Sequence, residues 1–397
     1  FHSPYAGTNS LTGDGASALT ETYGLYLGSR LGAHLDAYLD VEMARGGAVG
    51  NAVGLGSLTN GDVVRIGSVD LGQDPYVARA YLRYVVPLGG ETVNPGRGIG
   101  QLPGQLAADR LEFKLGKFAL TDDFDANRYA NSTRTQFMTW SLWNNTAWDY
   151  AADTRGYTNG AYLGWITPSW ELRFAAVQVV TFENGNLFDR DLQRAHAENM
   201  EATVRTGTWG PVLRALAWQN QARMGDYREA LATAQANGGS PDIVADERPG
   251  RVKYGYGLNV EQPLAAEGET GLFLRAGWND GATEDFMFTE SDQLLSLGLQ
   301  LCGCHWSREA DRAGIGVAVN GLSNAHRDYL AAGGLGFILG DGKLSYGDEM
   351  VTEFYYRLQA GTYVQISPDV QYIVNPGYNQ DRGPALVLGL RLRVYDF

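Results

Sequence analysis

Strict alternation of side-chain type is the feature that most limits what this chain can fold into. In the stretch AHLDAYLDVEM (33–43), aliphatic and small residues occupy every odd position, and mostly charged or aromatic residues occupy every even one. Side chains of a β-strand point alternately to opposite faces, so this stretch predicts a strand with one apolar and one charged face. The pattern recurs in YVARAYLRYVV (76–86), DRLEFKLGKF (109–118) and VKYGYGLNVE (252–261).

The whole chain repeats this unit. Together with the four stretches above, similar segments predict about fifteen strands. The further segments begin near residues 19, 159, 170, 197, 211, 270, 291, 313, 349, 361 and 385. Their connections alternate between short turns, such as 167–170 and 207–210, and long loops, such as 119–156 and 321–348, with 88–108 as a long exception among the turns. Short turns at one end and long loops at the other are typical of an outer-membrane barrel.

We therefore predict an all-β fold, with residues 1–397 forming a single transmembrane antiparallel β-barrel that has short periplasmic turns and long extracellular loops. At membrane depth a closed barrel pairs every backbone polar group. A soluble β-sandwich would also alternate, but the charged second face and the number of strands argue against it. Barrels of this class have an even number of strands, and residues 1–18 resemble a loop, so we predict 16 strands with the first upstream of Phe1.

The alternation assigns one face of the early strands to the lumen. On that face, acidic and basic side chains are expected to line the pore and to create a transverse field suited to neutral, polyhydroxylated solutes. The residues are Asp36, Asp40, Glu42, Arg79, Arg83, Arg110, Glu112 and Lys114. Ala78 and Ala80 are expected on the opposite, apolar face with Leu82.

The long segment 119–156 is predicted to constrict the pore. It combines Trp140, Trp143 and Trp148 with many charged residues, and a loop this long in a compact domain is usually functional. The alternative is a surface loop packed by its own aromatic residues, and the sequence leaves open whether the segment folds into the pore.

Motifs for cofactors and catalysis are weak. The stretch DDFDAN (122–127) resembles part of a calcium loop, but Arg128 and Arg134 replace the required Gly and Glu, so only a looser calcium site remains an alternative and no cofactor is predicted. The pair Cys302 and Cys304 is too small for a zinc site. We find no G-x-S-x-G motif and no grouped histidines, so the chain is not expected to be an enzyme. A net charge of −14 argues against nucleic acid as a partner.

Several motifs resemble the carbohydrate-selective porins of the OprB type. The stretches that carry the resemblance are FHSPYAGTNSL (1–11), GKFALTDDFDANRYAN (116–131), RTQFMTWSLW (134–143), RMGDYREAL (223–231), RAGWNDG (275–281), YLAAGGLGFILGDG (329–342) and YIVNPGYNQDRGPALVLGLRL (372–392). The resemblance implies a 16-stranded barrel of the bacterial outer membrane that passes sugars by diffusion. By their positions in the matching motifs, the resemblance implies six candidate pore residues, namely Asp125, Asn127, Arg128, Trp140, Asp381 and Arg382.

We therefore expect a passive, sugar-preferring porin whose partners are small carbohydrates, outer-membrane lipid and lipopolysaccharide. The alternatives are a general or ion-selective porin and, from another class, a structural barrel in an envelope assembly. The sequence leaves open whether the chain is a monomer or a homo-oligomer.

The C-terminal stretch LVLGLRLRVYDF (386–397) is predicted to be the closing strand. Every second residue from Leu386 to Val394 is apolar and is expected to face the lipid. Phe397 falls on the alternate set of positions, which is expected to face the lumen. We expect a bulge between Leu392 and Phe397 that turns the phenylalanine outward.

Overall fold

The computed structural model describes residues 7–11, 15–62 and 71–396 of the chain. They form one antiparallel sheet of 15 strands in which each strand pairs with its neighbour in sequence. The strands are β1 (Thr20–Arg30), β2 (Leu35–Gly46), β3 (Tyr76–Val93), β4 (Leu106–Phe118), β5 (Thr158–Ile166), β6 (Trp170–Val177), β7 (His196–Arg205), β8 (Val212–Met224), β9 (Arg248–Ala265), β10 (Thr270–Asn279), β11 (Gln293–Cys302), β12 (Arg312–Gly321), β13 (Glu349–Gly361), β14 (Val364–Val374) and β15 (Ala385–Val394).

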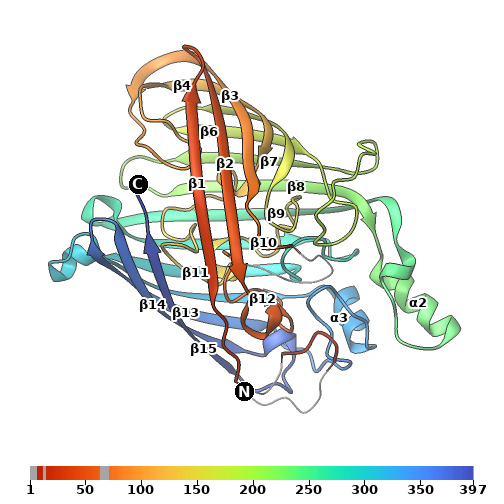
Figure 1. Ribbon diagram of the computed structural model, residues 1–397. Coiled ribbons are helices and arrows are strands. Elements are labelled where there is room, and N and C mark those ends of the chain that lie inside the picture. The colour runs from red at the N-terminus through yellow and green to blue at the C-terminus, as the bar shows by residue number, and fades with distance from the viewer. Residues whose placement is uncertain (1–6, 12–14, 63–70, 397) are drawn as a thin grey trace.

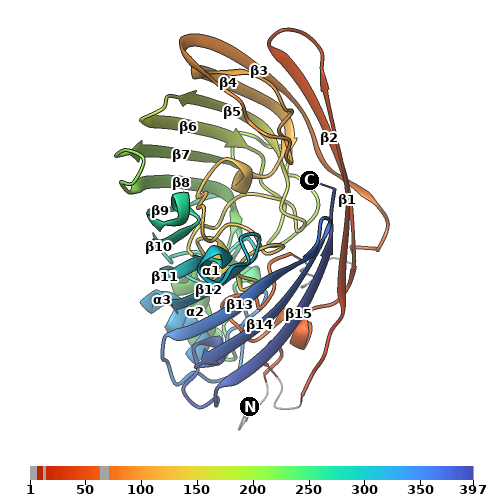
Figure 2. The ribbon, with the colours of Figure 1, turned by 90° about the vertical axis from the view of Figure 1, so that its left-hand side faces the viewer.

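The sheet curls strongly, so that β1 and β15 come to the same side of the molecule (Figures 1 and 2). The predicted all-β antiparallel fold is confirmed, and the predicted strand starts fall at or near the observed ones. The expected strand upstream of Phe1 lies outside the chain and stays a prediction.

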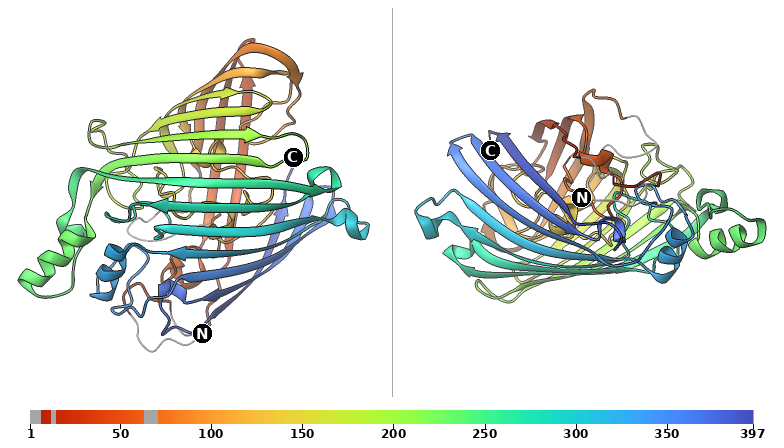
Figure 3. Two further views of the ribbon diagram at one scale, coloured as in Figure 1. Left: turned by 180° about the vertical axis from the view of Figure 1, so that it is seen from behind. Right: turned by 90° about the horizontal axis from the view of Figure 1, so that it is seen from below.

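Helices are few and belong to the connections. They are α1 (Trp140–Trp143), α2 (Tyr227–Asn237) and α3 (Asn324–Ala331), with short 3-10 turns η1 (Val49–Ala52), η2 (Leu120–Asp122), η3 (Val244–Asp246), η4 (Ala266–Gly268), η5 (Gly303–Trp306) and η6 (Pro376–Tyr378). In the described part of the chain, no helix has the length and apolar character needed to cross a membrane. The longer helices α2 and α3 lie together at the end of the sheet where the long loops gather (Figure 3).

The two faces of the sheet have the polarity expected from the alternation. On β2, Asp40 is only 1% exposed on the inner face, whereas its neighbour Leu39 is 41% exposed on the outer face. On β9, Lys253 is fully buried while Tyr254 is exposed. The inner face is therefore polar and the outer face apolar, which is the reverse of a soluble domain and suits a lipid surround.

One prediction about which face of the sheet a residue occupies is wrong. Ala78 was expected on the apolar outer face, but it is fully buried, and Val77 is 44% exposed instead. The cause is a register shift in the β2–β3 ladder, where Asp40 pairs with Arg79 and the next residue, Val41, pairs with Val77. Ala78 is thus the extra residue of a β-bulge, which changes the phase of the strand.

The last strand pairs regularly for as far as it is described. Its ladder with β14 runs in step from Ala385 opposite Ile373 to Val394 opposite Val364, and the Tyr395 N–H donates to the Tyr363 carbonyl at 3.1 Å. Between Leu392 and Tyr395 the expected bulge is therefore absent. The orientation of Phe397 lies outside the described residues.

The interior of the curled sheet is occupied largely by the packed side chains of one long connection. Segment 119–157 runs inside the strands, as Figure 2 shows in gold, and most of its side chains are buried. Phe124, Trp140, Trp148 and Tyr150 belong to one buried cluster with residues of the wall, and Phe137 and Leu142 belong to another. The question left open by the sequence is answered: this segment folds inward.

Candidate functional site

The inner segment 119–157 is anchored to one side of the wall by a buried polar network. Arg275 on β10 is fully buried, and its Nε lies 2.9 Å from Oδ2 of Asp125. The Asn259 amide on β9 donates to Asp125 Oδ1 at 2.7 Å, and Glu201 on β7 accepts the Asp125 N–H at 2.7 Å. Buried polar groups need such partners, so Asp125 positions the segment against β7, β9 and β10.

Aromatic packing reinforces this anchor. The Phe137 ring contacts the rings of Phe273 and Tyr355, with centroids 5.4 and 4.9 Å apart. The Trp148 indole N–H donates to Asn199 Oδ1 at 2.9 Å, and Asn127 donates to Asn259 at 2.7 Å. The segment thus fills the side of the interior lined by the middle strands, while Asp125, Asn127 and Trp148 are held in its packing.

A cavity of about 190 Å³ lies beside β2 and β3. Its lining includes Glu42 on β2, Arg79 on β3 and the indoles of Trp140 and Trp143 from the inner segment. The cavity combines a charged wall with an aromatic wall, and it brings together four of the residues expected to line the pore.

The charged wall is built around Arg79. Its Nε and Nη2 each lie 2.6 Å from one carboxylate oxygen of Asp122, and its Nη1 donates to Asp40 at 3.3 Å. Two parallel bonds to one carboxylate fix the guanidinium in position. Enclosure by the protein opposes ionisation of Asp122, but Arg79 outweighs it and holds the pKa of Asp122 below its usual range.

Glu42 is the second centre of the charged wall. It accepts hydrogen bonds from the hydroxyls of Tyr76 at 3.3 Å and Tyr157 at 2.5 Å. Arg134 of the inner segment lies 3.5 Å from Glu42 and binds Asp62 at 2.7 Å. The wall therefore presents cationic, anionic and hydroxyl groups within one small space.

The aromatic wall is formed by rings from two different loops. Trp140 and Phe288 stack nearly parallel, with centroids 5.0 Å apart and an angle of 19°, and Trp143 lies 4.8 Å from Trp140. Tyr150 joins the group at 4.9 Å from Phe288. Ring faces carry partial negative charge that attracts polarised C–H groups, so this wall suits the C–H face of a solute whose hydroxyls reach the charged wall.

Charges along β2, β3 and β4 pair with close neighbours. Arg83 binds Asp36 at 2.8 Å, Arg110 binds Glu112 at 2.6 Å, and Lys114 binds Asp123 at 2.7 Å. Arg83 and Asp36 are cross-strand neighbours on β3 and β2, whereas Arg110 and Glu112 share β4 and Asp123 belongs to the inner segment. On this wall opposite charges therefore lie side by side, and the expected transverse field between opposed charge rows stays a prediction.

The other predicted residues lie away from the cavity. Arg128 binds Glu269 at 2.6 Å in the β9–β10 turn, at the short-turn end. Arg382 is buried and contacts Asp341, with its Nε 2.6 Å from Oδ2, whereas Asp381 is exposed. A role of these residues in solute contact stays a prediction.

The aspartates of DDFDAN do not converge on one point. Asp122, Asp123 and Asp125 each bind a different cation, namely Arg79, Lys114 and Arg275. The two cysteines are free thiols, with Cys302 buried and Cys304 exposed.

Several lining residues were not among the individual pore residues predicted from the sequence. Arg134, Arg155 and Tyr150 lie in the predicted constriction segment and share its charged and aromatic composition, which was the available signal. Phe288 comes from the β10–β11 connection, 280–292, which carries no periodic pattern and was not identified as a functional loop. Only the folded chain brings it beside Trp140.

Comparisons with known proteins give a consistent result. A sequence model of the carbohydrate-selective porin, OprB family, matches residues 102–395. The protein named "Putative porin QuiX" from Acinetobacter baylyi is 25% identical over 321 residues, which are 72% of this chain and 65% of that protein, so the match spans less than two thirds of the relative.

Solved structures show the same fold. The high-pH structure of Pseudomonas putida OprB has a TM-score of 0.68 at 16% identity, covering 98% of this chain and 91% of that one. The low-pH structure of the same protein has a TM-score of 0.50 at 15% identity, covering 96% and 86%.

Proposed function

Because the chain belongs to the OprB family of carbohydrate-selective porins, we propose that its cavity between β2, β3 and the inner segment passes small carbohydrates by passive diffusion. As a porin of the bacterial outer membrane, the chain is a channel and not an enzyme. The observation that carries the proposal is the pairing of stacked rings at Trp140 and Phe288 with the fixed charges of Arg79 and Glu42 around one cavity.

The chemistry of a sugar suits this pairing. Each hydroxyl can donate to a carboxylate such as Glu42 and accept from a guanidinium such as Arg79, while the C–H face of the ring lies against an aromatic side chain. Because these charges already pair with their neighbours, a neutral solute does not have to compensate a bare ion. A conducting pore must also release its solute, so weak binding is expected.

A polar track supports passage beyond the cavity. Further along the inner face of β3, towards the short-turn end, Arg83 binds Asp36 at 2.8 Å and donates to the Gln101 side chain at 2.9 Å. These groups continue the alternation of donors and acceptors towards the short-turn end. The exposed apolar side chains of the outer face would contact outer-membrane lipid and lipopolysaccharide.

Liposome swelling with a panel of sugars tests the proposal, and Trp140→Leu sharpens it. Loss of ring stacking is worth about 0.5–1.5 kcal/mol, so we expect sugar block of single-channel current to weaken roughly three- to tenfold. Trp165→Leu is the matched control, because Trp165 is 43% exposed on the outer face of β5.

Equal effects of the two tryptophan variants would contradict the proposal. Swelling that follows solute size alone would favour the general porin, and strongly ion-selective reversal potentials without sugar block would favour the ion-selective one. An absence of any conductance would favour the structural barrel.

A further inference from the structure

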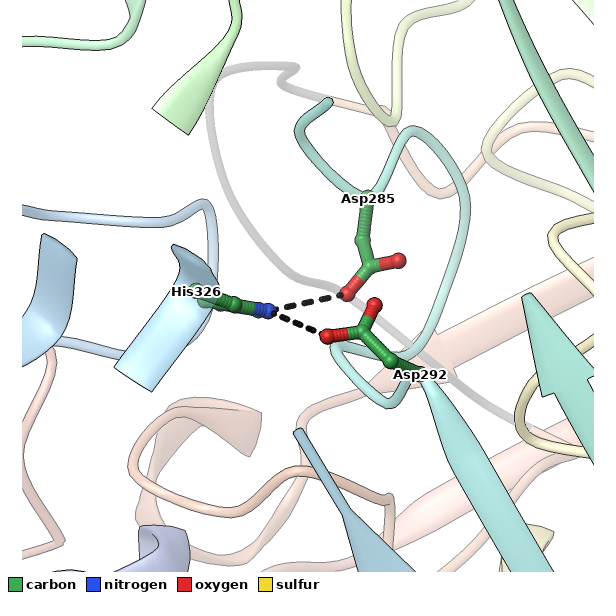
Figure 4. A group of neighbouring side chains, drawn as sticks. All are labelled: Asp285, Asp292 and His326. Carbon is green, nitrogen blue, oxygen red and sulfur yellow. Dashed lines mark hydrogen bonds and ion pairs between the residues drawn. The ribbon is translucent and has the colours of Figure 1, made fainter. Parts of the chain in front are cut away.

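Three ligand-type side chains converge outside the cavity, at the long-loop end. Asp285 and Asp292 come from the β10–β11 connection, and His326 comes from helix α3 (Figure 4). His326 Nδ1 lies 3.2 Å from Asp292 Oδ2 and 3.8 Å from Asp285 Oδ2. All three side chains are almost completely buried, so they are enclosed by protein and do not form a solvated acidic patch.

The spacing of these atoms suits a single metal ion. Nitrogen and oxygen ligands bind zinc-type ions at about 2.0–2.2 Å, which places two ligands of a tetrahedral ion about 3.4 Å apart. The observed separations of 3.2 and 3.8 Å lie on either side of this value. One imidazole with two carboxylates is a donor set that suits first-row divalent ions.

Unsatisfied atoms give a second, independent observation. Asp285 Oδ2, the atom that faces His326, has no hydrogen-bond partner among the described residues although it is buried, and the same holds for Asp292 Oδ1. Leaving a buried acceptor unsatisfied is costly. An ion at the centre of the group would supply the missing partner for Asp285.

The charge balance points in the same direction. Lys253 contacts both Asp285 and Asp149, the latter at 3.6 Å, so Asp149 is linked to the group through this ammonium. In the form that metal ligation requires, with a neutral imidazole and with Asp149, Asp285 and Asp292 ionised, the three carboxylates exceed the single ammonium by two negative charges. A buried charge excess is unfavourable unless it is compensated, and a divalent ion compensates it in full.

The ligands are held in place before any ion binds. The Ser323 N–H donates to Asp292 Oδ2 at 2.7 Å, and the Ser323 hydroxyl caps helix α3 by accepting the His326 N–H at 3.1 Å. The ring of Tyr227 stacks on His326, with centroids 4.3 Å apart. Such surrounding contacts orient metal ligands and raise affinity.

We propose that Asp285, Asp292 and His326 bind a divalent transition-metal ion of the zinc and cobalt class. The ion would tie the β10–β11 connection to helix α3. Since Phe288 lies in that connection and lines the cavity, the ion would also hold one ring of the aromatic wall in position. The site does not depend on which solute passes through the cavity.

The test uses the full chain in detergent after treatment with a chelator. Added Co²⁺ should produce the visible absorption of a nitrogen- and oxygen-ligated ion, and calorimetry with Zn²⁺ should show one site per chain. His326→Ala and Asp292→Asn should each weaken binding by at least about tenfold. His34→Ala is the matched control, because His34 is exposed at the opposite, short-turn end.

The nearly isosteric variant Asp285→Asn guards against loss of folding, and circular dichroism should show the same strand content for every variant. Absence of a cobalt spectrum in the wild-type chain, or unchanged binding in the folded variants, would overturn the proposal. A response to Ca²⁺ alone would also overturn it, since that result would favour the all-oxygen group of Glu183, Glu247 and Glu284.

Discussion

Arg275 on β10 lies entirely inside the barrel and binds Asp125 of the inner segment, with 2.9 Å between Nε and Oδ2. The same guanidinium donates to the carbonyls of Leu142 at 2.8 Å and Ala130 at 2.6 Å. One wall residue therefore holds three separate points of the segment that lies inside the curled sheet. Electrostatic attraction, and not packing alone, therefore fixes the position of the segment.

Replacing Asp125 should release this anchor. Asp125→Ala leaves a buried arginine without its carboxylate, which typically costs about 3–5 kcal/mol. We expect a lower free energy of unfolding, measured by tryptophan fluorescence in denaturant, and larger, noisier single-channel currents as the segment leaves the lumen. Asp191→Ala removes an exposed carboxylate and should change neither quantity; a stable, quiet channel in Asp125→Ala would contradict the anchoring role.

Small residues in the wall should be needed where the inner segment approaches it. A Cβ atom at Gly277 would lie only 2.0 Å from Oδ1 of Asn145, and that oxygen accepts the Ala147 N–H at 3.0 Å. Gly277→Ala should therefore cost about 1–3 kcal/mol through overpacking. Gly32→Ala, where nothing lies within 4 Å of the added carbon, should have little effect on the same unfolding curve.

Removing Arg79 should alter both solute binding and ion preference. Arg79→Ala leaves Asp122 and Asp40 without their shared cation, so the pore becomes more cation-selective and the pKa of Asp122 rises. Loss of a charged hydrogen bond is worth about 1.5–3 kcal/mol, so sugar block should weaken by roughly tenfold or more. Reversal potentials and current block measure the two effects, and Arg190→Ala, an exposed loop residue, controls for net charge. Identical behaviour of both variants would remove Arg79 from the solute path.

The loops at the long-loop end should loosen at alkaline pH. Burial raises the pKa of Glu290 to about 8, although His326 opposes the shift. A carboxyl whose pKa is raised in the folded state stabilises that state below its ordinary pKa, and this contribution is lost as pH rises towards and through 8. The hydrogen-exchange protection factor near Ile338, whose N–H donates to Glu290 at 3.3 Å, should fall over this range once the intrinsic rise of exchange with pH is removed. Glu290→Gln, which stays neutral, should flatten the dependence; an unchanged pH profile in this variant would exclude Glu290 as its source.

Much of the fold could be predicted because the alternation of polar and apolar residues within each strand shows which side chains face inward. Asp40 is buried and Leu39 is exposed, as period-two alternation required. The prediction failed at Ala78, because the bulge there arises from pairing between β2 and β3 and leaves no mark within β3 itself. It was also incomplete at Phe288, since residues 280–292 follow no period.

The sequence by itself determined the number and polarity of the visible strands, the inner and outer faces, and the long aromatic segment that was the candidate for a functional loop. These properties are local, because a strand's alternation and a loop's length and composition are set by neighbouring residues. Tertiary structure decided that the long segment folds inward and which inward-facing groups share a site. Arg79 meets Asp122 and Trp140 meets Phe288 only because the curled sheet and its inner segment bring distant parts of the chain within hydrogen-bonding and stacking distance.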